Sequence, residues 1–264
     1  MMKIAVVGSG ISGLGASYYL GKRHHVDLYE SDTRLGGHTH THKILLEEEI
    51  NVDSGFIVFN DLNYPNLIQF FNELGVETAD TDMSFSVSSK TSTWSSNEFK
   101  KLSTFFKPAK LNFLKNIIKF NHAAKQNIVG ISFKEWLSNK NLKKEFINDY
   151  VLPMAAAIWS TPMDKIGEYP VESMLAFLKN HGLLKLINRP QWHFVKNGSA
   201  SYIDAIIQTP NINNVFTGES PIINKSNQQW RLKTSNHELD YDQVVIATPV
   251  SYTHLTLPTS SQVV

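Results

Sequence analysis

The sequence predicts an α/β protein in which a mostly helical segment interrupts a parallel sheet. Two apolar runs, at residues 3–7 and 26–30, flank an expected helix over residues 11–22, as in a strand–helix–strand unit. A third apolar run, at residues 242–249, returns to the strand pattern near the end of the chain. Helix signals dominate much of the stretch between these runs. We therefore expect a Rossmann-like domain that carries an inserted, mostly helical domain.

A glycine-rich turn directly follows the first expected strand. The chain reads G-x-G-x-x-G at Gly8, Gly10 and Gly13. In this pattern Gly8 permits the tight turn, Gly10 lets the backbone approach a pyrophosphate, and Gly13 lets the helix pack close to the strand. The helix N-terminus near Ser12 offers free N–H groups and the positive end of the helix dipole to phosphates.

An acidic residue closes the second expected strand. Glu30 stands about 20 residues beyond the glycine turn, where a carboxylate can accept hydrogen bonds from both hydroxyls of an adenosine ribose. This favours an unphosphorylated ribose over a 2′-phosphate. Glycines also fill ordinary turns, but here strand, helix, second strand and terminal acid occur in the expected order. The pattern predicts an adenine-dinucleotide site.

The chain continues with E-x-x-x-R-x-G-G, which resembles a motif of the amine oxidase, protoporphyrinogen oxidase and phytoene desaturase superfamily of flavoproteins. The resemblance implies FAD as the cofactor in place of NAD. It places Arg34, Gly36 and Gly37 along the FAD pyrophosphate and ribityl chain. The family often has arginine after the diglycine; here it is His38, whose charge depends on pH. Ile222 stands where the family places an apolar residue against the adenine.

A narrower resemblance covers most of the chain, from about residue 3 to residue 249. It is to a bacterial and plant subgroup of FAD/NAD(P)-binding oxidoreductases, related to a module fused to plant cyclopropane-fatty-acid synthases. The segments that carry it are residues 37–41, 52–60, 64–67, 82–87 and 155–160. This resemblance implies a cofactor but no particular reaction. Since the flavin would carry the chemistry, no catalytic side chain is named.

The order of elements predicts two interleaved domains. Residues 1–60 and 196–250 would form the FAD-binding Rossmann-like domain, with a third strand segment around residues 53–59 and a hairpin over residues 228–241. Residues 61–195 would form the mostly helical substrate domain.

Three helix signals stand out in the insertion. One helix is expected to begin at Pro65 and to stop at Gly75. A second opens with the capping box at residues 132–135. A third begins at Pro170 and ends before Gly182.

Composition narrows the class of protein. The hydrophobic share of 42% and charged share of 19% are ordinary for a globular chain, and a net charge of +1 gives no argument for nucleic acid binding. The absence of cysteine excludes disulfides, zinc–thiolate sites and a cysteinyl–flavin link. No stretch approaches the roughly 18 apolar residues of a spanning helix, and the first strand leaves no room for a signal peptide. We expect a cytoplasmic protein.

Lysines are concentrated in one part of the expected insertion. Residues 99–144 contain eleven lysines and a single acidic residue, Glu135. On a helix that begins at Pro108, an apolar face is expected opposite Lys115 and Lys119; its members are Leu111, Leu114, Ile117, Ile118 and Phe120. One interpretation is an amphipathic helix whose lysines are simply solvated. The other is peripheral docking at an anionic membrane, on the inner face, which would suit a lipid-like substrate.

Three histidines alternate after the diglycine. In an extended strand, His38, His40 and His42 project to one side, and imidazole suits zinc, copper or nickel. Because no carboxylate cluster is placed to complete a site, we predict no metal and expect these residues to line the cofactor. Asp53 is expected either to orient the cofactor loop or to cap a turn.

The end of the chain departs from the family pattern. The family continues beyond residue 249 to a final glycine–aspartate motif that contacts the flavin. Residues 251–264 are instead similar to translated sequencing-adapter read-through, so we expect a non-native tail and a fragment without activity. A short C-terminal strand is the alternative.

We expect an FAD-dependent oxidoreductase of the dehydrogenase, oxidase or desaturase type that passes a hydride from an unidentified small-molecule substrate to flavin N5, with a lipid-like molecule as one candidate. Two alternatives remain open. One is a flavin-dependent isomerase or mutase with no net redox change. The other is a nucleotide-binding accessory subunit of a lipid-modifying enzyme.

Overall fold

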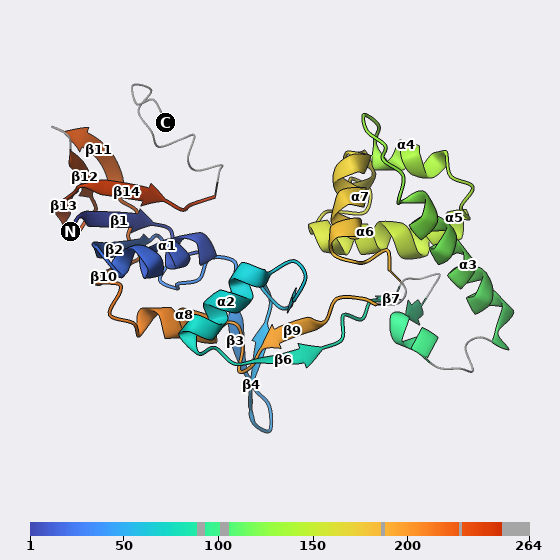
Figure 1. The fold of residues 1–264 in the computed structure, drawn as a ribbon, viewed down its shortest axis with the longest axis horizontal. Helices are drawn as coiled ribbons and strands as arrows, with labels where there is room; N and C mark the ends of the chain where they lie inside the picture. The colour runs from blue at the N-terminus through green and yellow to red at the C-terminus, as the bar shows by residue number, and fades with distance from the viewer. Residues whose placement is uncertain (89–92, 101–105, 186–187, 227–228, 250–264) are drawn as a thin grey trace. The chain divides into compact units, whose positions relative to one another are not determined.

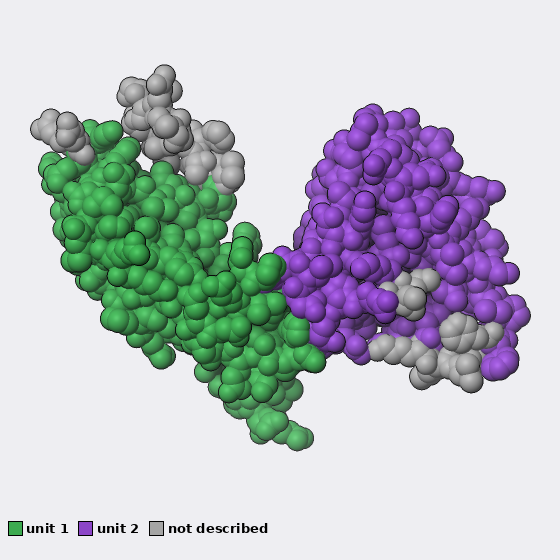
Figure 2. All heavy atoms as spheres, in the orientation of Figure 1, with its two compact units in different colours: residues 1–59, 65–80, 193–264 green, residues 60–64, 81–192 purple. Residues whose placement is uncertain are grey.

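A computed structural model describes residues 1–88, 93–100, 106–185, 188–226 and 229–249. The chain forms two compact units (Figure 2). Unit 1 contains Met1–Phe59, Pro65–Asp80 and the chain from His193 onward, and unit 2 contains Asn60–Tyr64 and Thr81–Trp192. The expected non-native tail lies outside the described residues.

Unit 1 is built on a parallel sheet with strand order β10-β2-β1-β14 (Figure 1). Its strands are β1 (Lys3–Val7), β2 (His25–Glu30), β10 (Asn214–Thr217) and β14 (Gln243–Ile246), and α1 (Ile11–Gly21) connects β1 to β2. Ala5, Val6, Val26 and Leu28 are fully buried, as the continuous apolar runs of a parallel sheet require. The predicted Rossmann-like α/β fold is confirmed.

The strand that pairs with β2 on its outer side is not the one expected from the sequence. The structure puts β10 there, in register with residues 27–30 of β2. Residues 53–59, expected as the third strand, instead cover the end of β4 (Glu49–Asp53), a bend and the start of β5 (Phe59–Asn60). Residues 49–53 instead pair with residues 41–45 in an antiparallel hairpin, and the Asp53 carboxylate accepts a hydrogen bond from the Ser199 N–H.

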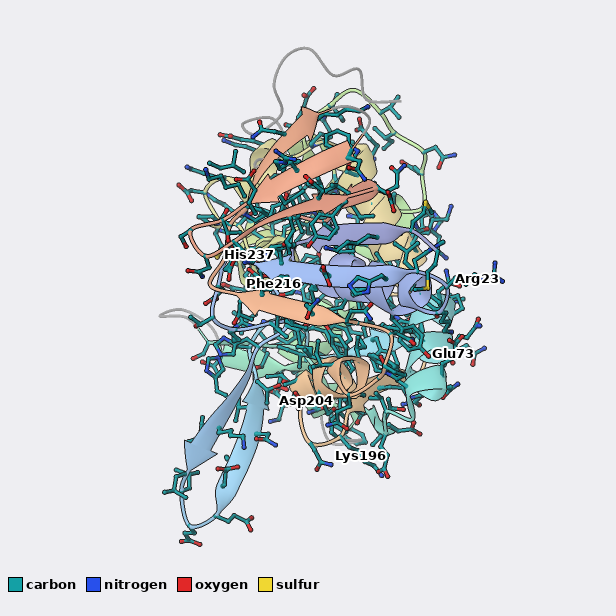
Figure 3. All side chains as sticks on the ribbon, turned by 90° about the vertical axis from the view of Figure 1, so that its left-hand side faces the viewer. Arg23, Glu73, Lys196, Asp204, Phe216 and His237 are labelled. Atoms are coloured by element: carbon teal, nitrogen blue, oxygen red, sulfur yellow. The ribbon has the colours of Figure 1, made fainter. Side chains whose placement is uncertain are left out.

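Smaller sheets complete this part of the chain. The expected hairpin is present as β12 (Gln229–Lys233) and β13 (Glu238–Tyr241), which with β11 (Ile222–Ser226) form an antiparallel sheet. A second hairpin, β3 (Thr41–Leu45) with β4, extends away from the body of unit 1 (Figure 3). A three-stranded sheet has the order β5-β9-β6, from β6 (Thr78–Thr81) and β9 (Trp192–Val195).

The compact units and the predicted domains have different boundaries. Residues 65–80, which we placed in the inserted domain, belong to unit 1. The cause is packing of α2 (Pro65–Leu74): the Phe70 ring lies 5.3 Å from Tyr18 of α1. Its neighbour Phe71 lies 5.6 Å from Tyr202 of α8 (Ala200–Ile207).

Unit 2 is mostly helical. Its main helices are α3 (Pro108–Ala123), α4 (Phe133–Ser138), α5 (Lys144–Phe146), α6 (Leu152–Trp159) and α7 (Val171–Asn180), with a π-helical segment over Ile147–Val151. Short elements are β7 (Ser86–Ser88), β8 (Thr93–Ser95), and 3₁₀ turns at Ser96–Lys100 and Ile166–Glu168. The core is apolar and includes the aromatic side chains of Phe120, Phe133, Trp136 and Phe146. No helix in the described part of the chain is long and apolar enough to cross a membrane.

Helix ends follow their sequence signals closely. The Ser132 hydroxyl caps α4 by accepting a hydrogen bond from the Glu135 N–H at 3.1 Å. α2 stops at Gly75, whose φ of +68° is left-handed and therefore suits glycine. The expected apolar face of α3 is divided: Ile117 and Phe120 are buried, whereas Leu111 and Ile118 are exposed.

Candidate dinucleotide site

The glycine turn between β1 and α1 has no space for a side chain at Gly8 or Gly13, but it has space for one at Gly10. Gly8 has a φ of +102°, and an added Cβ would lie 2.7 Å from the Ala247 carbonyl oxygen. At Gly13 an added Cβ would overlap the Gly8 carbonyl, so the helix packs directly on the turn. At Gly10, by contrast, an added Cβ would meet nothing within 4 Å. This open side of Gly10 is where a phosphate could approach the backbone.

The start of α1 is suited to an anion. Gly10 is the N-cap and supplies no side-chain cap, and the first turn contains no acidic residue. Ser12 is exposed in this turn. The first N–H groups of the helix and its positive dipole end therefore face an open surface.

The loop that contains Gly36 and Gly37, which we call the diglycine loop, lies directly against the glycine turn. The Gly36 N–H donates to both the carbonyl and the hydroxyl oxygen of Ser9, each at 3.1 Å. Gly37 has a φ of +57°, and an added Cβ would lie 2.9 Å from the Gly10 Cα atom. On its other side, a Cβ on Gly36 would collide with Ile203 of α8. Gly36 has a φ of +110°, so a left-handed backbone favours glycine at both positions, and close backbone contact adds to this at Gly37.

Glu30 is fixed beside these two loops by four donors. Its Oε2 accepts from the Ser9 N–H at 2.8 Å and the Ser9 hydroxyl at 2.5 Å. Its Oε1 accepts from the Asp32 N–H at 2.9 Å and the Ser31 hydroxyl at 3.1 Å. Desolvation opposes ionisation, but these hydrogen bonds outweigh it and hold the pKa of Glu30 below its ordinary value. Glu30 is therefore a preoriented carboxylate.

Ser9 connects the glycine turn, Glu30 and the diglycine loop, and it was not predicted from the sequence. The side chain is fully buried and touches the glycine turn, Glu30 and the diglycine loop. Its position is a variable one in G-x-G-x-x-G, so the motif itself gives no signal. A small hydroxyl residue between two glycines was the only hint available.

Arg34 turns its guanidinium onto its own loop. Nη1 donates to the carbonyl oxygens of Leu35 at 3.2 Å and Thr39 at 2.7 Å, and Nη2 donates to that of Gly37 at 2.8 Å. Arg34 therefore holds the diglycine loop in shape. His38 is exposed in this loop. Ile222 opens β11 with a side chain that is 65% exposed.

Asp53 stabilises the start of α8. Its carboxylate accepts from the N–H of Ser199 at 2.9 and 3.0 Å and from the Ser199 hydroxyl at 2.9 Å. It also accepts from the Thr41 hydroxyl at 2.5 Å, which ties the base of the β3–β4 hairpin to α8. Neither hydroxyl partner was identified from the sequence, because both are distant along the chain.

Two of the three alternating histidines come together. The rings of His40 and His42 are 3.9 Å apart, and His42 Nε2 lies 2.8 Å from the Ser54 hydroxyl. Desolvation, then His42 and Arg34, hold the pKa of His40 below its ordinary value. Within the described ranges, no group of three histidine, aspartate or glutamate side chains is placed to hold a metal ion.

A cavity of about 410 Å³ lies between the diglycine loop and α8. Its lining includes Arg34, Leu35 and His40 from the loop side and Ile203 and Ile207 from α8. Because Gly36 faces Ile203 while Gly37 faces Gly10, the loop separates this cavity from the glycine turn.

The fold and site define a Rossmann-like α/β protein with a dinucleotide-binding turn. In agreement, residues 6–74 match the family of NAD(P)-binding Rossmann-like domains. A search of curated protein sequences found no match.

Several solved structures with a similar fold are oxidases. Cyclohexylamine oxidase from Brevibacterium oxydans IH-35A is 17% identical with a TM-score of 0.70, covering 98% of this chain and 61% of its own. Putrescine oxidase bound to putrescine is 18% identical with a TM-score of 0.67, covering 94% and 58%. A candidate protoporphyrinogen oxidase from Exiguobacterium sp. 255-15 is 16% identical with a TM-score of 0.67, covering 98% and 62%. This chain thus has the fold of these oxidases and spans about three fifths of their length.

Proposed function

We propose that the protein is an FAD-dependent oxidoreductase, of the dehydrogenase, oxidase or desaturase type, acting on a small, lipid-like substrate. The observation that carries this proposal is the joining of the diglycine loop to the glycine turn, with Glu30 fixed beside both. The resemblance of the E-x-x-x-R-x-G-G segment to flavoproteins supports FAD over NAD. The oxidases among the structural neighbours support an oxidation.

The residues of the site fit a dinucleotide. Open space at Gly10 and the uncapped start of α1 suit the two phosphates. Glu30 can accept hydrogen bonds from the ribose hydroxyls if one of the four donors that now bind its carboxylate is released. The Ser31 hydroxyl is the best candidate to turn aside, because Ser31 is exposed and its 3.1 Å bond is the longest of the four. Ser9 then keeps the carboxylate in place.

When bound, the flavin supplies a hydride acceptor at its N5 atom. The chain's own residues would bind the cofactor and hold it in position. Arg34 and Ser9 keep the diglycine loop against the glycine turn, and Gly36 and Gly37 allow that contact. We assign no side chain to proton transfer. His38 and Ile222 remain proposed contacts of the cofactor.

Two other functions fit the same site. A flavin-dependent isomerase or mutase would bind FAD but show no net bleaching by its substrate. A nucleotide-binding accessory subunit would remain colourless and would bind NADH. Absorbance spectra separate these three functions when they are recorded, with and without candidate substrates, on a gene product that contains this chain and spans the full length of the oxidases.

Gly10→Ala is the sharpest test of the site, because the structure predicts an effect on the ligand alone. Gly10 has a φ of −65° and free space around its would-be Cβ, so alanine should fold normally. The new methyl group would occupy the space proposed for the pyrophosphate. We expect the Kd for FAD, measured by quenching of flavin fluorescence, to rise about tenfold or more, a loss of about 1.4 kcal/mol.

Gly15→Ala is the matched control. Gly15 lies in α1 and also has free space around its would-be Cβ, but it is not part of the glycine motif. It should leave the Kd unchanged. Equal FAD affinity in wild type and Gly10→Ala would exclude the proposed pyrophosphate position.

A further inference from the structure

The outward face of α3 in unit 2 combines apolar and basic side chains. Its inward face buries Asn116, Ile117, Phe120 and Asn121 against the core of the unit. The exposed fraction is 39% at Leu111 and 49% at Ile118. These two residues are seven positions apart, so they lie on one side of the helix, away from the core.

The exposed residues form one continuous line along the helix, which we call the α3 stripe. Its members follow at intervals of four, four, three and four residues, the spacing of a single helix face: Lys107, Leu111, Lys115, Ile118 and His122. Phe106, 80% exposed, stands immediately before the stripe. A helix of 16 residues carries the stripe over about 24 Å.

Acidic residues are few along this part of the chain. α3 itself contains no acidic residue, and Glu135 is the single acid between residues 99 and 144. Two lysines beside the stripe are engaged within unit 2: Lys110 pairs with Glu98 at 2.7 Å, and Lys119 donates to the Asn141 carbonyl. The stripe lysines Lys107 and Lys115 are exposed, and Lys107 also interacts electrostatically with Glu98.

We propose that the α3 stripe docks unit 2 on an anionic lipid surface. This inference does not depend on the proposed oxidoreductase activity. Leucine, isoleucine and phenylalanine would enter the boundary between headgroups and acyl chains. The lysines would reach the lipid phosphates with their long stems along the same surface. Nucleic acid would leave the three apolar side chains without a partner, and a neutral bilayer would leave the lysines without one.

The test is co-sedimentation of the purified protein with vesicles of phosphatidylcholine alone or mixed with phosphatidylglycerol. We expect binding to the mixed vesicles only, and release as salt shortens the Debye length from about 30 Å at 0.01 M to about 3 Å at 1 M. Lys107→Gln with Lys115→Gln should weaken binding about tenfold or more. Leu111→Ser with Ile118→Ser should also weaken it, with only a small loss of Tm, because both side chains are largely exposed.

Lys134→Gln with Lys143→Gln is the matched control, since it removes the same charge from exposed positions outside the stripe. Retained binding in this control supports the proposal. An equal loss in both lysine pairs would overturn it in favour of diffuse basic charge. Binding to neutral vesicles, or to nucleic acid but not to vesicles, would overturn it as well.

Discussion

At the scale of single residues, the site depends on side chains that hold the backbone in place. Ser9 connects Glu30 to Gly36, and Arg34 binds three carbonyl oxygens of its own loop. Glu30 could be predicted from the sequence because its place after a strand is fixed by the motif. Ser9, Thr41 and Ser199 could not, because a hydroxyl gives no local signal of which distant group it will bind.

The lowered pKa of Glu30 predicts a pH-dependent contribution to stability. A carboxyl whose pKa is lowered by folding stabilises the protein above its unfolded pKa, ordinarily 4.5, and loses that effect as pH falls through the folded value. Glu30→Gln should therefore lower Tm at neutral pH, and the difference from wild type should shrink below about pH 4.5. Calorimetry at several pH values measures this. A Tm difference that is constant from neutral to strongly acidic pH would contradict the assignment.

At the scale of elements, β1, the glycine turn and α1 pack closely because Gly8 and Gly13 have no side chain. Local signals therefore placed this strand–helix–strand unit correctly. The buried face of α3 was not predictable in the same way. Leu111 and Ile118 are apolar but exposed, while Asn116 and Asn121 are buried beside Ile117 and Phe120, so hydrophobicity alone does not give the limits of the buried face.

Gly13→Ala should destabilise unit 1. The new Cβ would overlap the Gly8 carbonyl, which belongs to a backbone fixed by the Gly8 N–H bond to the Tyr29 carbonyl at 2.8 Å. We expect a loss of roughly 2 kcal/mol or more in urea unfolding. Gly15→Ala on the same helix should instead stabilise the protein by about 0.5–1 kcal/mol. Equal stability of the two variants would show that the turn can move.

At the scale of the whole molecule, each unit has its own core. The apolar core of unit 2 runs from Ile117 to Leu184, while Ala5, Tyr29, Leu232 and Tyr241 pack together in unit 1. The sequence predicted the insertion, but it could not predict that β10 would lie beside β2, since strand neighbours distant along the chain leave no periodic signal.

Separate cores predict separate effects of core mutations. Phe120→Ala should remove about 3–5 kcal/mol from unit 2, where the Phe120 ring is fully buried. Amide exchange should then speed up in α4 and α7 but not in β1 and β2. Leu28→Ala, equally buried in unit 1, should give the reverse pattern. Faster exchange in both units from either change would show that they unfold together.

The pairing of β1 with β14 has a consequence for synthesis on the ribosome. Ile4 lies opposite Gln243, so nearly the whole chain must be made before the first strand gains this neighbour. At typical rates of translation, that delay is on the order of 10–50 s. For most of it, the apolar β1 and β2 lack both outer strands of their sheet, and the residues of unit 2 are complete at Trp192, before either outer strand is made. Nascent chains should therefore be most prone to aggregation through their N-terminal strands, and chaperones should engage them there until β14 emerges.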